Sequence, residues 1–235
     1  MSPRARRVRL VVTLSDGLVV VVPRGFNQRE IPGMIEAKRA WIERATTRVA
    51  VRAAERRERL ATEPWADRPE RLALQCLGAE WGVEYFSSPS VAKTTIRERP
   101  GRLLIVRGDV DDAGACRAAL RRWLGRKART TIAARLKVLA YEHGFEAGSI
   151  SVRAQRTRWA SCSRRGAISL NAKLLFLPPD LVDYVLLHEL CHTVRMDHSA
   201  AFWALLKEHD PECRSKRRLL KEAHQHVPPW FDTSS

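Results

Sequence analysis

The sequence predicts an α+β fold from three observations. Short runs with β-type composition occur near the N-terminus and again between residues 71 and 107, and such runs are typical of strands. Two long segments instead repeat their apolar residues every three to four positions, as amphipathic helices do. A further pair of β-type runs precedes a histidine-bearing helix near the C-terminus. With 235 residues, 45% of them hydrophobic, the chain is long enough to bury a core in one or two domains.

The first element is a predicted β-hairpin. Its strands are residues 8–14 and 18–22, and Ser15-Asp16-Gly17 supplies the turn. Because these three residues interrupt the apolar stretch, we interpret the basic N-terminus as a hairpin and not as a secretion signal. After residues 23–31 comes a long helical pattern. Its apolar positions include Met34, Ile35, Trp41, Ile42, Ala45 and Val49.

The middle of the chain predicts a sheet followed by a long helix. Prolines break the helical periodicity around residues 61–70. Four short runs then predict strands of one sheet: 71–78, 81–86, 93–98 and 102–107. From Asp112 to about His143 the apolar residues recur at helical spacing. Arginines occupy other positions of this helix, namely Arg117, Arg121, Arg122, Arg126 and Arg129. We interpret them as a solvated face, because no aromatic residue interleaves them as a base-stacking groove would require.

A second domain is expected to begin near residue 148. The predicted domains are 1–147, a β-rich region with two long helices, and 148–235, which carries the histidine motif. In the second domain we expect strands at 149–159 and 167–177, joined by a turn at 160–166. Pro178 and Pro179 end the second strand. A helix should start there, because proline is tolerated in the first turn and Asp180 favours the positive end of the helix dipole.

Composition limits the partners and the compartment. No stretch approaches the roughly 18 apolar residues that a membrane-spanning helix needs, so we expect no membrane role. The five cysteines are scattered and form no C-x-x-C pair, which favours a reduced, cytoplasmic setting. The formal net charge of +16 allows nucleic-acid binding through a basic surface. A generally basic proteome would explain the same charge.

The helix after Pro179 contains the sequence HELCH, residues 188–192. Residues four apart lie on one face of a helix, so His188 and His192 can direct a ring nitrogen at one ion. Nitrogen ligands at about 2.0–2.1 Å suit Zn²⁺. Glu189 is displaced by about 100° around the helix, from where it can reach a water on the ion. This arrangement makes Glu189 the expected general base of a metallohydrolase.

A catalytic zinc generally has three protein ligands and leaves its fourth position to water. We favour His198 as the third ligand, because Ser199 after it is a good N-cap for a helix over residues 200–209 and the chain must reverse there. Three other histidines remain alternatives: His209, His224 and His226.

The metal and one nearby thiol leave further alternatives. Cys191 lies between the two ligand positions of the helix, and a thiolate binds zinc well. We interpret Cys191 as a small buried residue, because as a ligand it would compete with Glu189 and water. Zn²⁺ is the expected ion, although Mn, Co and Ni also accept imidazole ligands.

A resemblance to a known family rests on three segments: QRTRWASCS (155–163), GAISLNAKLLFLPPDLVDYVLLHELCH (166–192) and DHSAAFW (197–203). Together they resemble the YgjP-like family of zincin-type metal-dependent hydrolases, which is related to the SprT-like and WLM metalloproteases. Residues 19–31 and 38–42 are similar to that family too, so the resemblance covers most of the chain.

The resemblance implies a zincin-like α+β C-terminal domain. It also implies that His188, His192 and His198 bind zinc and that Glu189 is the catalytic residue. The chain departs from the family pattern at Ala160, where glycine is usual, and at Ala172, where a bulky aromatic residue is common. The second departure affects the expected shape of the substrate cleft.

The expected activity is hydrolysis of a peptide or protein substrate. Glu189 would take a proton from a metal-activated water and pass it to the leaving amine. An extended peptide could add to the edge of a strand within 154–162 or 167–175. Two alternatives stay open: a metal-dependent hydrolase of nucleotide phosphoanhydrides, and a non-catalytic, zinc-containing nucleic-acid-binding module.

Overall fold

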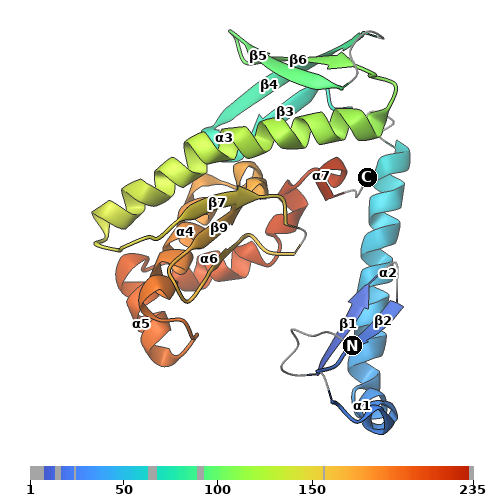
Figure 1. Cartoon of the computed structure of the whole chain (residues 1–235), viewed down its shortest axis with the longest axis vertical. Helices are drawn as coiled ribbons and strands as arrows, with labels where there is room; N and C mark the ends of the chain where they lie inside the picture. Colours follow the sequence, from blue (N-terminus) through green and yellow to red (C-terminus); the bar gives the residue numbers. More distant parts are fainter. Residues whose placement is uncertain are drawn as a thin grey trace. The chain divides into compact units, whose positions relative to one another are not determined.

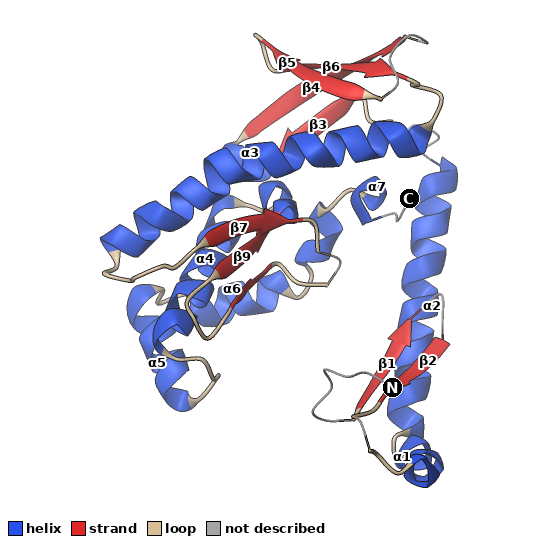
Figure 2. Cartoon of the chain, in the orientation of Figure 1, coloured by secondary structure: helices blue, strands red, loops and turns tan. Residues whose placement is uncertain are grey.

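The computed structural model describes residues 8–13, 17–23, 25–62, 68–88, 93–155 and 157–232, without the side chains of 52, 53, 55–62 and 232. These residues form an α+β protein, as predicted (Figures 1 and 2). The chain divides into two compact units, residues 1–64 and 65–235. The domain boundary expected near residue 148 stays a prediction.

The first unit contains the predicted hairpin and the first helical segment. Strands β1 and β2 pair antiparallel, and the turn residues 14–16 lie outside the described residues. The expected helical pattern is divided at Lys38, where φ of −113° and ψ of 10° leave the helical region. The elements are β1 (Arg9–Thr13), β2 (Gly17–Val21), the 3₁₀ helix η1 (Gln28–Glu30), α1 (Ile31–Ala37) and α2 (Arg39–Thr62).

The second unit begins with a four-stranded sheet in the order β3-β4-β6-β5, which confirms the prediction of one sheet. Strands β4 and β6 are parallel, and the other pairs are antiparallel. Gly108, with φ of 138°, lets Thr94 approach: a Cβ at position 108 would lie 2.7 Å from the Cα of Thr94. The elements are β3 (Arg71–Leu74), the 3₁₀ helix η2 (Gln75–Leu77), β4 (Ala79–Ser87), β5 (Thr95–Arg99) and β6 (Leu103–Gly108).

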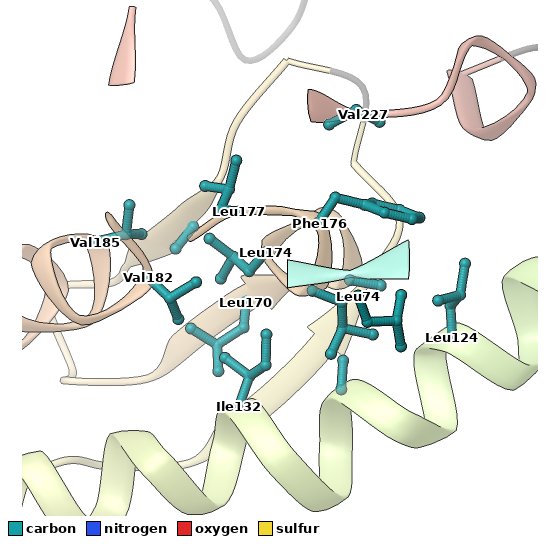
Figure 3. Packing of buried hydrophobic residues seen from close by; sticks show 14 of the residues in the cluster. Leu74, Leu124, Ile132, Leu170, Leu174, Phe176, Leu177, Val182, Val185 and Val227 are labelled. Atoms are coloured by element: carbon teal, nitrogen blue, oxygen red, sulfur yellow. The ribbon is translucent and has the colours of Figure 1, made fainter. Parts of the chain in front are cut away.

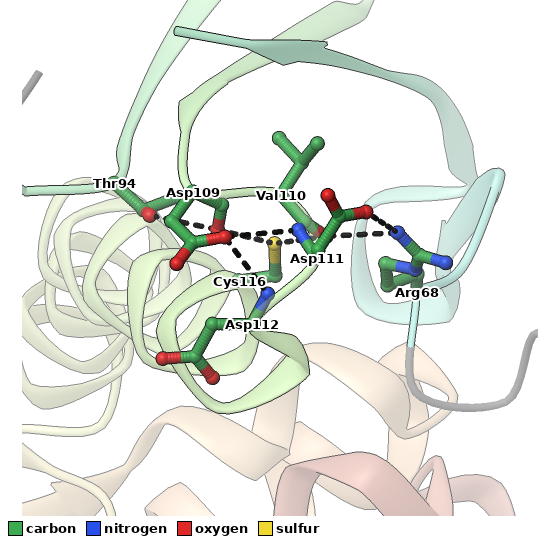
Figure 4. Close-up of polar contacts among 7 residues, drawn as sticks. All are labelled: Arg68, Thr94, Asp109, Val110, Asp111, Asp112 and Cys116. Atoms are coloured by element: carbon green, nitrogen blue, oxygen red, sulfur yellow. Dashed lines mark hydrogen bonds and ion pairs between the residues drawn. The ribbon is translucent and has the colours of Figure 1, made fainter. Parts of the chain in front are cut away.

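The predicted long helix is α3 (Ala113–Glu142). Side-chain caps fix its start, and Figure 4 shows those made by Asp109. Asp112 Oδ1 accepts a hydrogen bond from the backbone N–H of Ala115 at 3.1 Å, and Asp109 Oδ1 accepts from the backbone N–H groups of Asp111 and Asp112. Carboxylates that accept these otherwise unpaired N–H groups stabilise a helix start.

Two arginines of α3 do more than face solvent. Arg121 donates a hydrogen bond to the carbonyl of Trp230 at 3.2 Å, and its guanidinium lies over the ring of Phe231. Arg122 donates to the carbonyl of Thr94 at 2.6 Å. These two members of the expected solvated face therefore connect α3 to other segments of the unit.

The C-terminal part contains a three-stranded sheet in the order β7-β9-β8. Both expected strands were too long, and the expected turn at 160–166 contributes a strand. Asn171 explains the early end of β9, because its side-chain oxygen accepts from the N–H of Lys173 at 3.1 Å and starts a 3₁₀ helix. The elements are β7 (Ile150–Arg153), β8 (Ala160–Cys162), β9 (Ile168–Asn171) and η3 (Ala172–Phe176).

Helix α4 begins at Pro179, as predicted, and α5 covers the predicted residues 200–209. Ser199 holds the N-cap position of α5, but its side chain makes no capping hydrogen bond. Instead its backbone N–H donates to Asp197 Oδ1 at 3.2 Å. The remaining elements are α4 (Pro179–Val194), α5 (Ala200–His209), α6 (Cys213–Leu220), the 3₁₀ helix η4 (Ala223–His226) and α7 (Pro229–Asp232).

One buried apolar cluster joins these parts of the second unit (Figure 3). It runs from Leu74 of the larger sheet, through Leu124 and Ile132 of α3, to Leu170 of β9 and Val182 of α4. Burying one such side chain contributes about 1.5–3 kcal/mol, so α4 is firmly held. Within the described residues, no helix combines the length and the apolar character that crossing a membrane requires.

Candidate metal centre

Helix α4 presents its polar residues from a largely buried surface. Leu186 and Leu190 are fully buried, and Glu189 and His192 keep only 7% and 8% of their surface exposed. His188 is half-buried, whereas His198, in the segment between α4 and α5, is exposed. The core therefore fixes the two helical histidines, and the third approaches from a loop.

The three histidines converge. One ring nitrogen from each of His188, His192 and His198 can be chosen so that all lie within 4.8 Å of one another. The Nε2 atoms of His188 and His198 are 3.1 Å apart. Four-coordinate zinc with bonds of about 2.0–2.1 Å places its ligand nitrogens roughly 3.3 Å apart. The His188–His198 pair matches that spacing, and the three imidazoles together form a group that could hold a divalent ion.

Neighbouring groups orient the rings. His192 Nδ1 lies 2.9 Å from the carbonyl oxygen of Arg195, to which it donates, so Nε2 keeps its lone pair for an ion. Trp203 donates from Nε1 to the carbonyl of His198 at 3.1 Å, and its ring stacks on the His198 ring at 5.7 Å. The ring of Phe202 lies 4.5–4.9 Å from all three imidazoles. The three imidazoles thus pack against one apolar ring, and contacts with Arg195 and Trp203 orient those of His192 and His198.

Burial sets the protonation of the site. It lowers the pKa of His188 to about 3, and the nearby charges of His192, His198 and Arg217 act in the same direction. A neutral imidazole is the form that binds metal. Burial raises the pKa of Glu189 to about 7, against the opposing effects of the Cys162 N–H and the Arg158 charge. A carboxyl group that titrates near neutrality is suited to accept and return a proton.

Glu189 lies beside the edge strand β8. The backbone N–H of Cys162 in β8 donates a hydrogen bond to its carboxylate. The segment that leads into β8 is held by Asn171, which is buried and donates to the carbonyls of Gln155 at 2.7 Å and Arg158 at 2.6 Å. The local structure around Glu189 therefore depends on one buried amide.

A cleft of about 540 Å³ opens at the histidines. Its lining residues are Trp159, Tyr184, His188, His198, Trp203, Arg217, Leu220 and Lys221. Arg217 is not among the site residues that the sequence motifs predict. The available signal was the spacing of Arg214, Arg217 and Lys221, which places three cations along one face of a short helix.

The alternative histidines lie in other contacts. His209 Nδ1 is 3.1 Å from Nδ1 of His143, and His226 Nδ1 is 3.3 Å from Nε2 of Gln75. His224 stacks on Trp159, with ring centroids 4.8 Å apart. Cys191 is buried, and burial raises the pKa of its thiol to about 12. Among the described residues, the group of side chains that could hold an ion consists of His188, His192 and His198 and does not include Cys191, which supports its interpretation as a packing residue.

This combination of an α+β unit, a three-histidine cluster and an adjacent buried glutamate is typical of metal-dependent hydrolases. The chain belongs to the YgjP-like metallopeptidase family, whose domain matches residues 6–223. It is therefore a metal-dependent hydrolase of the peptidase type, and the family inferred from the sequence motifs is confirmed.

Comparison with curated proteins finds no match. Among solved structures, the chain is similar to the zymogen of the metallopeptidase jannalysin from Methanocaldococcus jannaschii, with 20% identity, a TM-score of 0.35, and coverage of 39% of this chain and 94% of that one. It is also similar to the zymogen of abylysin from Pyrococcus abyssi, with 23% identity, a TM-score of 0.35 and the same coverage of both chains.

Proposed function

We propose that this protein is a zinc-dependent metallopeptidase. In the proposal, residues 148–235 form a zincin-like catalytic domain in which His188, His192 and His198 bind the zinc. The observation that carries the proposal is the convergence of three imidazoles, with ring nitrogens within 4.8 Å of one another, beside a buried carboxylate.

Glu189 is the proposed general base. When bound, zinc would supply Lewis-acid chemistry: it would polarise the scissile carbonyl and lower the pKa of a water. Glu189 would accept a proton from that water and deliver it to the leaving amine nitrogen. The hydrogen bond from Cys162 in β8 holds the Glu189 carboxylate in place. Burial raises the pKa of Glu189 to about 7, close to neutral pH.

Strand β8 is the proposed binding edge for an extended substrate. Of the two strands considered from the sequence, β9 is paired on both sides, by β7 and β8, and has no free edge. Strand β8 is an edge strand, and it lies beside Glu189. Adding a substrate strand there would bring its backbone next to the general base.

Metal content is the first test. We expect about one zinc per chain, by mass spectrometry, in the wild type and in His226→Ala, a control that removes a histidine outside the cluster. His198→Ala should lose most of it, because two imidazoles hold the ion much less tightly than three. Absence of zinc from the wild type, or its full retention in His198→Ala, would contradict the ligand assignment.

Substrate class is tested on the same protein. We expect cleavage of casein and no release of phosphate or pyrophosphate from nucleoside triphosphates. Hydrolysis of the triphosphates with casein left intact would instead assign the site to phosphoanhydrides. A full zinc content with neither activity would support a non-catalytic binding module.

A further inference from the structure

Helix α6 carries a row of three cations next to the histidine cluster. Arg214, Arg217 and Lys221 are spaced i, i+3 and i+7, so they lie along one face of the helix and its first following residue. Arg217 and Lys221 line the cleft that contains His188 and His198.

A second cavity adjoins this cleft. It has a volume of about 520 Å³ and shares Trp203 and Arg217 with the first cavity. Its other charged lining residues are Lys207 and Arg214. The two cavities, here together called the groove, therefore meet at Trp203 and Arg217, and the second adds two cations to the lining.

The cations of this row lack acidic partners within the part of the chain that the structure describes. No ion pair there involves Arg214, Arg217 or Lys221. Two acidic groups just before this helix pair with another of its side chains: Lys216 lies 2.9 Å from Asp210 and 4.0 Å from Glu212. None of the residues that line the two cavities is acidic. The groove therefore presents a net positive charge to whatever enters it.

Arg217 is held in place by an aromatic ring. Its guanidinium carbon lies 4.4 Å from the centroid of Trp203, and Trp203 stacks on His198. Stacking engages the face of the guanidinium and leaves its N–H edges available for a carboxylate, which can accept two parallel hydrogen bonds. Arg217 is thus positioned in advance to bind a carboxylate. The side chains of Trp203 and His198 connect it to the proposed metal site.

We propose that this groove binds an acidic segment of the polypeptide substrate, on one side of the scissile bond. The proposal rests on the proposed peptidase function, since the histidine site would make the cut. Arg217 and Lys221, the two cations of the row that line the histidine cleft, are about 6 Å apart along the helix axis. Alternate side chains of an extended peptide point the same way and are about 6.6–6.8 Å apart. Two acidic residues separated by one position would therefore match this pair.

The aromatic contacts favour a peptide over a single-stranded nucleic acid. Sequence-tolerant nucleic-acid binding uses aromatic rings on which bases stack. In this groove Trp203 is already stacked with His198 and covered by Arg217, and Trp159 is stacked on His224 at 4.8 Å. The three cations of the row are exposed, and Trp203 already has two stacking partners, which favours carboxylates over bases as the bound groups.

Binding to the full-length Glu189→Gln protein tests the proposal without turnover. Three fluorescein-labelled twelve-residue peptides would be compared by anisotropy: one with two Glu residues at alternate positions, one with Gln and one with Lys at the same positions. We expect the Glu peptide to bind about tenfold more tightly than the Gln peptide at 50 mM salt, with the advantage falling as salt rises.

Variants locate the effect. Combining Glu189→Gln with Arg217→Gln, or with Arg214→Gln, Arg217→Gln and Lys221→Gln together, should bring the Glu and Gln peptides to equal affinity. Arg218→Gln is the matched control, because Arg218 is on the same helix but lines neither cavity. Equal binding of the two peptides by the parent protein, or the same loss in Arg218→Gln, would overturn the proposal. So would tighter binding of a single-stranded DNA twelve-mer that is lost in the triple variant.

Turnover separates this proposal from the peptidase proposal. For the wild type we expect the ratio of kcat/KM for the Glu peptide over the Gln peptide to be about ten, and to fall toward one in Arg217→Gln. Cleavage of casein and of both peptides at equal rates would remove the acidic preference and leave the peptidase standing. Tight, Arg217-dependent binding of the Glu peptide without cleavage of any substrate would remove the peptidase and leave the acidic groove.

Discussion

Helices α4 and α6, which both line the cleft, differ in how they are held. Most residues of α4 are buried, including Glu189 and His192, whereas in α6 Cys213 is the buried residue. A helix locked into a core fixes its side chains to the precision that proton transfer and metal binding need. A helix on the surface can carry several like charges, which stay hydrated until a partner neutralises them. The two proposals above therefore place the chemistry on α4 and the recognition on α6.

The largest expected difference between the helices concerns activity. Glu189→Gln should lower kcat for casein cleavage by about 10²–10⁴-fold, because it removes the proposed general base. The matched substitution on the other side is Glu212→Gln, at the start of α6, which should leave kcat within about twofold. Both would be measured at full zinc occupancy. Comparable losses in the two variants would break the assignment of chemistry to α4.

Core packing should show the same contrast. Leu190→Ala in α4 removes a fully buried side chain and should lower the free energy of unfolding by about 2–5 kcal/mol. Leu219→Ala in α6 removes a side chain that is 53% exposed and should cost less than about 0.5 kcal/mol. Urea unfolding followed by circular dichroism measures both. A similar cost for the two would mean that α6 is buried in solution.

The support of β8 beside α4 gives a smaller effect. Asn171→Ala leaves the carbonyls of Gln155 and Arg158 without their donor and should destabilise the protein by about 1–3 kcal/mol. Because this amide holds the segment that leads into β8, casein cleavage should also fall. Unchanged activity in a folded Asn171→Ala protein would show that Glu189 does not depend on the position of β8.

The attachment of α6 should depend on one ion pair. Asp210 is buried and lies 2.9 Å from Lys216, so Lys216→Gln leaves a buried carboxylate uncompensated. We expect a loss of about 1–2 kcal/mol, less than for a fully buried pair because Lys216 is partly exposed. Arg218→Gln on the same helix should change stability by less than about 0.5 kcal/mol. Equal effects would indicate that the ion pair does not hold α6.

Local sequence signals were enough to predict α4 and its histidines. Proline at the helix start and the four-residue spacing of His188 and His192 depend on nearest neighbours along the chain, and both appear where they were expected. Strand β9 is shorter than predicted because the Asn171 side chain caps the 3₁₀ helix that follows. The alternation of apolar residues does not predict such a side-chain hydrogen bond. Arg217 was missed for a different reason. Its place in the cleft depends on how α6 packs beside Trp203, which no local period specifies.

The position of His198 has a consequence for the kinetics of metal exchange. His188 and His192 belong to a helix anchored in the core, whereas His198 is exposed and lies on the short segment between α4 and α5. In the proposed site, His198 would release the ion before the two ligands on α4, so a bound ion would leave and enter on the side of His198. Trp203 stacks on His198 and donates a hydrogen bond to its carbonyl. By holding His198 in place, Trp203 would control the rate of metal exchange more than the metal affinity.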